Sequence, residues 1–490
     1  MKLLRNVHII TTLVLFALVS TSFGQLEDSW YSVSIDGSKA GWAHDTVEVD
    51  SETGNIISSK VQNMTLSRGG INISIAVTSV FTETKDGKPI SVNTSQEAMG
   101  QVQETSWEFG ADTLTMTTVA GGQPIIKKVP LPKSGWLTPG AVRKMFRKKM
   151  GEGATAITYR TMSPELGPTT ITVVMTKKGE EERDVMGTQQ LVTFWETVND
   201  KMPIVGTEYY TNAGLNVGSS MNAGFGAITN AIMEKHDALS PVNEVPELMV
   251  SLFVEPSKKI DNTKTQLAMK VTSKDGTKLT LPSAGYQRSQ SNEDGSVILT
   301  IDLANPTEAT ESEKIDEGFV SATAICDGTD TAVSKIANET LSALPTSSTK
   351  MEQALALRAK VYEYIDNKGM STAFASASQT ARNKEGDCSE HAVLLCGLLR
   401  AANIPSRGVM GLVYVPNYGK PNGVFGWHMW SQALVDGKWI DLDATLTEPF
   451  TVGHIATVTT SLSDEGMAAE MSGILATIGN LDVEVIEADE

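Results

Sequence analysis

One cysteine, one histidine and one aspartate follow each other in residues 383–445, each at the edge of a predictable secondary-structure element. The segment opens Asn-Lys-Glu-Gly-Asp-Cys-Ser-Glu-His-Ala, and its cysteine is Cys388. Asp387 is a good N-cap and Glu390 completes a capping-box pattern, so a helix is predicted to begin at or next to Cys388. Unpaired backbone N–H groups and the positive end of the helix dipole favour a thiolate there. Residues 393–399 are apolar on nearly every side, which predicts that the helix is buried.

The histidine and the aspartate lie on a predicted β-hairpin. Its two strands meet at Asp436-Gly437, a typical two-residue turn. Side chains alternate between faces, so counting outward from the turn puts His428 and Asp443 on one face as diagonal neighbours. Diagonal Cβ atoms are about 7–8 Å apart or less, which lets an imidazole N–H reach a carboxylate. Asp441 shares that face but is further from His428, and a three-residue loop would put Asp443 on the opposite face.

These three residue types form a nucleophile, a base and a residue that orients the base. The thiolate of Cys388 would attack a carbonyl, and His428 would then protonate the leaving amine while Asp443 fixes its tautomer. The product is a thioester acyl-enzyme. Water would complete a hydrolysis, whereas a lysine amine would give a crosslink, and the triad does not choose between them.

Four ordered blocks resemble the core of the bacterial transglutaminase-like superfamily: Gly-Asp-Cys-Ser-Glu-His-Ala, Leu-Leu-Arg-Ala-Ala-Asn-Ile-Pro-Ser-Arg, Trp-His-Met-Trp and Trp-Ile-Asp-Leu-Asp-Ala-Thr. The resemblance covers about the last third of the chain and implies that Cys388, His428 and Asp443 are the catalytic triad. It also implies a papain-like fold, with the cysteine helix packed on an antiparallel sheet. Most bacterial members are thought to be proteases or other amide hydrolases, which favours hydrolysis over crosslinking, although a fold does not settle the reaction.

Other polar residues near the triad admit alternatives. His391 lies one turn after Cys388, and with a second histidine and an aspartate these two could hold zinc. Structural zinc sites usually show tighter ligand spacing, so no metal and no cofactor is predicted. His454 is assigned a structural role. The backbone N–H of Cys388 is the natural oxyanion donor, with Gln379 or Trp427 as a candidate second donor.

The chain has three cysteines, Cys326, Cys388 and Cys396, which is no disulfide framework. Cys396 falls inside the apolar helix and is interpreted as a small buried hydrophobe. A bridge between Cys326 and Cys396 is conceivable, but nothing in the spacing indicates one.

The N-terminus has the pattern of a secretory signal peptide, residues 1–24. Lys2 and Arg5 precede an apolar run over residues 7–19, and small residues lead to a predicted cleavage after Gly24. The run is too short to span a bilayer, so we expect an exported, secreted or periplasmic protein and no integral membrane protein; an uncleaved anchor is the alternative. The formal charge of −18 becomes −20 when Lys2 and Arg5 are removed, and this acidity argues against nucleic-acid binding.

The whole chain is predicted to be a multidomain α+β protein. Residues 25–239 are rich in Val, Ile, Thr and aromatic residues with Asp-Gly and Gly-Gly turns, which predicts one large antiparallel sheet or open barrel. Within them, a short helix from Thr138 is locally basic, as either a solvated face or a docking patch for an acidic partner. Residues 214–232 read as a flexible loop leading into a helix.

Two further segments follow. We predict a small β domain over residues 240–330 and the cysteine catalytic domain, which begins with helices, over residues 331–490. The latter ends in an acidic tail with a short helix over 465–476 and a last strand over 483–486. We therefore expect an exported cysteine enzyme that acts on a protein or peptide amide, cell-wall peptides included. The alternative is a non-catalytic binding or assembly protein of the cell envelope with a relic cysteine domain.

Overall fold

The computed structural model describes residues 23–68, 71–98, 101–120, 124–133, 135–202, 204–223, 226–247, 252–369, 375–464, 473–474 and 477–486. Almost all of the predicted signal peptide and nearly all of the predicted tail helix over 465–476 therefore lie outside the described residues, as does the Gly121-Gly122 turn. Strand β1 begins at Phe23, two residues before the predicted first residue of the mature chain.

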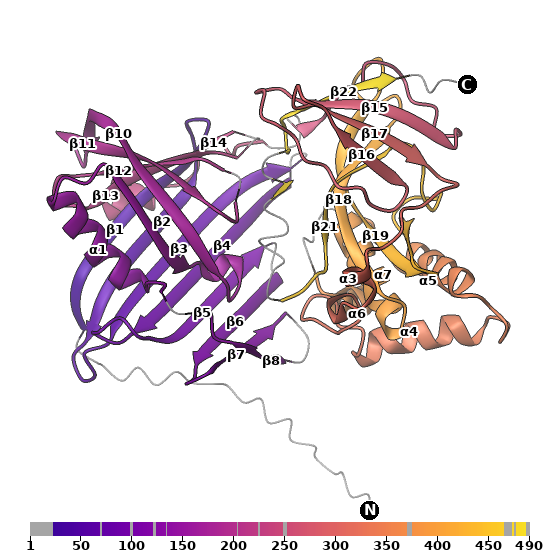
Figure 1. Ribbon diagram of the computed structural model, residues 1–490, viewed down its shortest axis with the longest axis horizontal. Coiled ribbons are helices and arrows are strands. Elements are labelled where there is room, and N and C mark those ends of the chain that lie inside the picture. Colours follow the sequence, from indigo (N-terminus) through magenta and orange to yellow (C-terminus); the bar gives the residue numbers. More distant parts are fainter. Residues whose placement is uncertain are drawn as a thin grey trace, which may run out of the picture.

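The N-terminal part is a single 14-stranded antiparallel sheet in the described residues, drawn in indigo to magenta in Figure 1. Its order is β8-β7-β6-β5-β4-β3-β2-β1-β14-β13-β12-β11-β10-β9. The strands are β1 (Phe23–Ile35), β2 (Ser38–Asp50), β3 (Ile56–Arg68), β4 (Ile71–Glu83), β5 (Pro89–Ala98), β6 (Gln101–Phe109), β7 (Thr113–Val119), β8 (Ile125–Pro130), β9 (Ala156–Met162), β10 (Thr170–Val185), β11 (Thr188–Asn199), β12 (Gly206–Tyr210), β13 (Asn216–Asn222) and β14 (Ala227–Met233).

This sheet curls into an open barrel. Met162 of β9 packs in one cluster with Phe81 and Trp107 of β4 and β6, so strands from opposite halves of the order share a core. Helix α1 (Pro139–Gly151) lies against the curled sheet, with Phe146 buried in a second cluster. The prediction of a large antiparallel sheet or open barrel is confirmed. The sequence pattern is informative here because tight turns such as Asp36-Gly37 join successive strands.

The prediction of a flexible loop over residues 214–232 is wrong. These residues form β13 and β14, which pair with each other and with their neighbours β12 and β1, and the helix that follows is the short α2 (Lys235–Ala238). Gly218 explains part of the error: a Cβ there would lie 2.6 Å from the carbonyl oxygen of Asn230. A small residue is thus required where two strands approach closely, although glycine alone disfavours a strand.

A second sheet has four strands in the described residues, in the order β16-β17-β15-β22. It contains β15 (Gln266–Ser273), β16 (Gln287–Ser291), β17 (Val297–Asp302) and β22 (Leu481–Ile486), with α3 (Glu311–Lys314) and a 3-10 turn (Glu317–Phe319) after it. β22 comes from the acidic tail, so the segment 240–330 completes its sheet with a strand from the other end of the chain (Figure 1).

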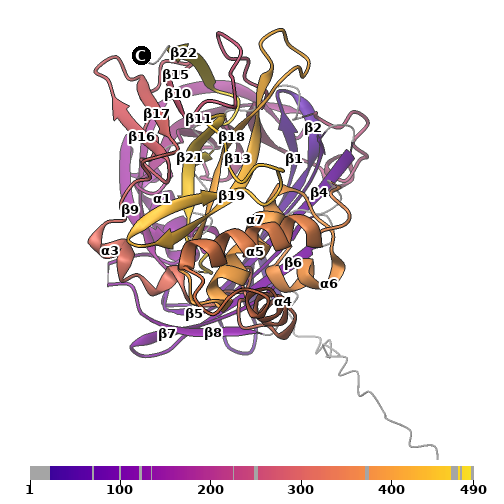
Figure 2. The ribbon, with the colours of Figure 1, turned by 90° about the vertical axis from the view of Figure 1, so that its right-hand side faces the viewer.

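The remaining elements surround one helix. Helices α4 (Thr331–Ser342), α5 (Lys350–Tyr364) and α6 (Ala377–Asn383) pack around α7 (Cys388–Ala401), as Figure 2 shows. α7 also packs on a third sheet, ordered β20-β19-β18-β21 and made of β18 (Ser406–Val415), β19 (Val424–Val435), β20 (Lys438–Leu442) and β21 (His454–Thr460). The predicted α+β class, with a β-rich N-terminal part and a helix-rich region after it, is confirmed.

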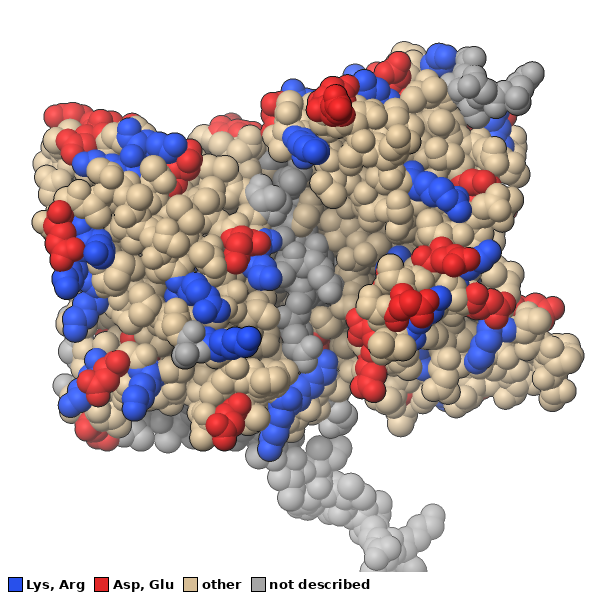
Figure 3. Space-filling view, in the orientation of Figure 1, with Lys and Arg blue, Asp and Glu red and all other residues tan. Residues whose placement is uncertain are grey.

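Two further features concern the apolar length of the helices and the distribution of charge on the surface. No helix in the described part of the chain combines the length and the apolar character needed to cross a membrane. On the face drawn in Figure 3, acidic and basic side chains are interspersed over both halves of the molecule.

Candidate active site

Cys388 is the first residue of α7, where the local sequence demands a helix start. The Asp387 side chain accepts a hydrogen bond from Ser389 N (2.9 Å), and the Glu390 carboxylate accepts one from Asp387 N (2.9 Å), so the expected capping box is present. Glu390 also accepts a bond from Ala375 N (2.9 Å), which ties the residues before α6 to the helix start. The rest of α7 is almost wholly buried, whereas Cys388 is only partly so. Cys388 therefore lies at the start of a rigid buried helix and remains partly exposed.

His428 and Asp443 meet as the hairpin register predicts. Asp436 and Gly437 both have positive φ (50° and 78°), and the pairing runs outward from that turn to Ser431 and Leu442. Asp443 is the next residue after β20, and its Oδ2 lies 2.7 Å from His428 Nε2. His428 Nε2 is thus engaged by the carboxylate, and the Cys388 thiol lies close enough to help raise the pKa of the same imidazole. The structure brings the three predicted residues together; their catalytic role stays a prediction.

Asp443 is held by several groups around it. Its Oδ1 accepts a hydrogen bond from Thr445 N (2.8 Å), and its carboxylate is completely buried. The Arg358 guanidinium, reaching over from α5, donates to the backbone oxygen of Asp443 (2.6 Å) and to the oxygens of Leu446 and Thr447. The segment that follows β20 is therefore clamped by one buried cation.

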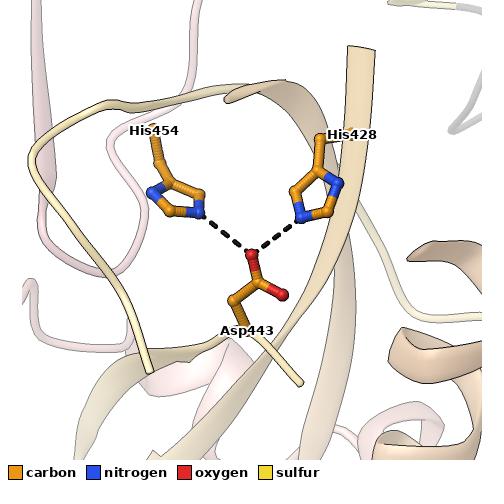
Figure 4. A group of neighbouring side chains, drawn as sticks. All are labelled: His428, Asp443 and His454. Carbon is orange, nitrogen blue, oxygen red and sulfur yellow. Dashed lines mark hydrogen bonds and ion pairs between the residues drawn. The ribbon is translucent and has the colours of Figure 1, made fainter. Parts of the chain in front are cut away.

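His454 lies on the same carboxylate as His428. Its Nε2 is 3.1 Å from Asp443 Oδ2, so two imidazoles approach one oxygen from opposite sides (Figure 4). His454 is fully buried, stacks on Phe450 at 4.1 Å between ring centroids, and has Nδ1 3.2 Å from Thr451 Oγ1. The sequence reasoning assigned His454 a structural role and missed this contact. No local sequence pattern predicts the contact between His454 and Asp443, because β21 reaches the site only by pairing with β18.

The carboxylate and the imidazole stabilise each other's charge. Burial disfavours a protonated His428, but the Asp443 carboxylate, its hydrogen bond and the Cys388 thiol outweigh burial and hold the pKa of His428 well above its ordinary value. Burial alone would raise the pKa of Asp443, yet the two histidines hold that pKa well below its ordinary value. Both shifts favour an imidazolium beside a carboxylate.

Asp441, the competing aspartate, has a different environment. Its Oδ1 accepts hydrogen bonds from Trp430 Nε1 and Gln432 Nε2, both at 2.7 Å, and its Oδ2 accepts one from Tyr286 N at 2.7 Å. Burial raises the pKa of Asp441, and these neutral donors only partly offset that effect. Asp441 therefore joins the small sheet to the third sheet, and it forms no hydrogen bond to His428 in the described structure.

The two candidate side-chain oxyanion donors lie in different environments. The Gln379 side-chain oxygen accepts a hydrogen bond from Ser376 N (2.9 Å) in the capping box of α6. Trp427 Nε1 is buried and has no hydrogen-bond partner among the described residues, but its side chain packs in the cluster beneath the small sheet. Because side chains alternate along β19, Trp427 and His428 leave the strand on opposite faces.

His391 and the metal alternative can be placed as well. His391 is fully buried, with Nδ1 2.6 Å from Asp387 O and with no hydrogen-bond partner for Nε2 in the described residues. The group of potential ligands found in the described residues is His428, Asp443 and His454, whose ligand atoms lie within 4.8 Å of one another. It includes neither Cys388 nor His391, so the zinc site considered from the sequence does not assemble there.

All three cysteines are free thiols. Cys326 and Cys396 are completely buried, and burial raises the pKa of both thiols. Cys396 is thus a small buried hydrophobe, as expected, and the conceivable bridge to Cys326 is not formed.

Comparisons with known proteins agree with the resemblance found in the sequence. Residues 335–444 match the family model of the transglutaminase-like superfamily. A search of curated proteins finds no match. Among solved structures, a β-barrel-like protein of the DUF1849 domain from Brucella abortus is 8% identical and has a TM-score of 0.33, over 42% of this chain and 94% of that one.

Two other solved structures are candidate proteases. A candidate cysteine protease from Cytophaga hutchinsonii is 16% identical, with a TM-score of 0.30 over 49% of this chain and 89% of that one. A candidate protease from Parabacteroides distasonis is 12% identical, with a TM-score of 0.19 over 73% of this chain and 68% of that one. At these identities and scores, the similarities say nothing about activity. The family match is independent of them: the chain carries the core of the transglutaminase-like superfamily in residues 335–444.

Proposed function

We propose that this protein is an exported cysteine hydrolase or acyltransferase that cleaves or exchanges amide bonds in a protein or peptide substrate. The observation that carries the proposal is the partly exposed Cys388 at the start of buried α7, together with a 2.7 Å His428–Asp443 pair. Export is proposed from the signal-peptide pattern of residues 1–24, with a secreted or periplasmic location.

The first chemical step is acylation. The Cys388 thiolate attacks the amide carbon, the carbonyl oxygen becomes an oxyanion, and the backbone N–H of Cys388 at the helix start is the natural donor to it. The His428 imidazolium then gives its proton to the amine as the carbon–nitrogen bond breaks. Asp443 stays ionised and holds the ring with one nitrogen toward it.

Deacylation decides between the two activities. If His428 takes a proton from water, the hydroxide attacks the thioester and the enzyme is a hydrolase. If it takes a proton from a substrate amine, the product is a new amide. We favour hydrolysis as the main activity because water needs no binding site for a second chain, and the family resemblance points the same way.

The test combines labelling with activity. Iodoacetamide should alkylate Cys388 much faster than the buried Cys326 and Cys396 near neutral pH, and His428→Ala should slow the alkylation of Cys388. A mass-spectrometric screen of peptides and cell-wall fragments should then reveal products with the native protein and none with Cys388→Ser. Cys396→Ser, on the same helix, is the matched control and should keep the activity. Adding a primary amine distinguishes transfer from hydrolysis.

A different result would favour another class of protein. Slow labelling of Cys388 that His428→Ala leaves unchanged, with no product from any substrate, would indicate a binding or assembly protein of the cell envelope. Products that persist in Cys388→Ser would place the chemistry elsewhere in the molecule.

A further inference from the structure

A cavity of about 330 Å³ is lined by strands of the curled N-terminal sheet and by α1. Its floor follows from strand register. Ser29, Asp45, Lys60 and Ser79 are successive cross-strand partners on β1, β2, β3 and β4, so their side chains form one row on one face. All four line the cavity.

This row is polar where a covered sheet face is ordinarily apolar. Helix α1 and strands β9, β10 and β12 complete the walls with larger side chains, among them Phe146, Tyr159, Met175 and Tyr210. Polar groups enclosed in this way lose water and gain stability only when hydrogen-bonded or paired. An apolar wall above a polar, charged floor is typical of a small-molecule site, and the volume is at the lower end of the range for such sites, about 300–1,000 Å³.

Arg143 supplies a cation to the lining of the cavity. In the described residues its guanidinium donates a hydrogen bond to the Ser58 hydroxyl and forms no ion pair. Arg147, one turn further along α1, is different, because it pairs directly with Glu27. Burial lowers the pKa of Arg143, and the surrounding acids only partly offset that effect. A carboxylate bound beside Arg143 would offset the energetic cost of burying its charge.

Asp45 supplies the complementary group. Its Oδ1 is buried and has no hydrogen-bond partner among the described residues, while its Oδ2 lies 3.9 Å from Lys60 Nζ. Burial raises the pKa of Asp45, with Lys60, His44 and Arg143 opposing it. Asp45 and Arg143 thus line the same cavity without forming an ion pair with each other in the described structure, so each can face one charge of a ligand that carries both.

We propose that this cavity binds a small zwitterion with an apolar side chain, namely a free amino acid or a dipeptide. The ligand's ammonium group would face Asp45 Oδ1, its carboxylate would face Arg143, and its side chain would lie against Phe81, Phe146 and Met175. An α-amino acid and a dipeptide share this chemistry and differ in the separation of the two charges.

This site is separate from the candidate active site, because none of its lining residues belongs to the segment 335–444. The proposal therefore stands whether or not Cys388 is catalytic. Cleavage of peptide amides nonetheless releases molecules of this kind, so a product or a substrate end is a ligand that such an enzyme would meet.

The experiment is isothermal titration calorimetry on the full chain carrying Cys388→Ser, so that no peptide is cleaved. The ligands are L-phenylalanine, phenylalanyl-phenylalanine, phenylalaninamide without the carboxylate, and N-acetylphenylalanine without the ammonium group. We expect saturable binding of at least one of the first two, and whichever binds more tightly identifies the ligand size. For L-phenylalanine, each of the two singly modified analogues should bind about tenfold more weakly or worse, because one charge-assisted hydrogen-bonded pair is lost.

Variants assign each charge to its partner. In Arg143→Gln the acid and phenylalaninamide should bind equally, and in Asp45→Asn the free amine and its N-acetyl form should bind equally. Lys144→Gln, an exposed position on the same helix, is the matched control and should bind as the parent does. Circular dichroism and thermal unfolding check that each variant folds; if one does not, the other variant and the ligand series decide.

Two results would overturn the proposal. One is no saturable binding of either zwitterion up to about 10 mM, which would indicate a cavity that holds water only. The other is binding that is indifferent to removal of the ligand's charges, which would indicate a merely apolar pocket.

Discussion

Replacing Asp443 with Asn tests whether the buried carboxylate controls the reactivity of the thiol. In the native protein, Asp443 Oδ2 accepts from His428 Nε2 at 2.7 Å and also contacts His454 Nε2 at 3.1 Å. An amide of the same shape carries no charge, and its NH₂ group would face ring N–H groups. Without the carboxylate, burial is the dominant influence on His428, so its pKa should fall to 6.5 or below.

The magnitude follows from that shift. With a pKa of 6.5 or lower, about one imidazole in ten or fewer is protonated at pH 7.5, whereas in the native protein nearly all are. The cation that stabilises the Cys388 thiolate is then mostly absent. We expect the iodoacetamide alkylation rate of Cys388 at pH 7.5 to fall by about tenfold or more, and amide turnover, once a substrate is known, by up to about 10⁴-fold, as when the orienting acid of a serine-protease triad is lost.

Asp441→Asn is the matched control, since both aspartates are buried and stand two residues apart. Asp441 accepts hydrogen bonds from neutral donors only, so its replacement should lower stability and leave Cys388 alkylation within about threefold of native. Equal losses of alkylation in the two variants would refute the reasoning, because the effect would then come from general loosening of the core.

The same variant predicts how stability depends on pH. The pKa of His428 is raised from 6.5 to about 10, so its contribution is complete below pH 6.5 and is lost as pH rises through about 10. The pKa of Asp443 is lowered from 3.8, so its contribution is complete above pH 3.8 and is lost only as pH falls below that value. Urea unfolding should therefore show Asp443→Asn destabilised by about 3–5 kcal/mol near pH 5–6 and by progressively less toward pH 10. A difference that grew with pH would contradict this sign.

Two further substitutions test the surroundings of the site. Gly285→Ala would place a Cβ 1.8 Å from Asp441 Oδ2 at a φ of +59°, so thermal unfolding should show that the protein loses at least about 2 kcal/mol of stability. Gly276→Ala is the control, because its φ of +77° is also positive but open space surrounds it, and it should lose only about 1 kcal/mol. Similar losses of stability in the two variants would refute the steric argument. Arg358→Met keeps the apolar stem and removes the hydrogen bonds to the segment after β20. We therefore expect a loss of stability of about 3 kcal/mol or more and slower alkylation of Cys388. An unchanged alkylation rate would show that Arg358 is not needed to position Asp443.

Short-range signals account for what could be predicted from the sequence. The capping box around Cys388 is a four-residue pattern, and the Asp436-Gly437 turn sets the register of a hairpin whose strands are adjacent in the chain. The turn brings His428 and Asp443 onto one face, and the capping box places Cys388 at the start of its helix. The family match over residues 335–444 confirms the superfamily, while the roles of these residues stay a prediction.

Long-range pairing accounts for what could not be predicted. His454 reaches Asp443 because β21 pairs with β18, two strands that the chain separates by the whole hairpin. Arg358 reaches the same aspartate from α5, far upstream. Residues 214–232, rich in Gly, Asn and Ser, look like a loop until their neighbours β12 and β1 are in place, and strand preference depends on such context more than helix preference does.

Strand β22 also governs the order in which the molecule can assemble. β15 lies between β17 and β22, so its second set of ladder hydrogen bonds cannot form until the ribosome has made the chain as far as residues 481–486. Until then β15 presents an open edge, the kind of surface that recruits other chains. Truncating before Leu481 would leave that edge permanently uncovered, so the middle segment completes its sheet only when the C-terminal strand is present.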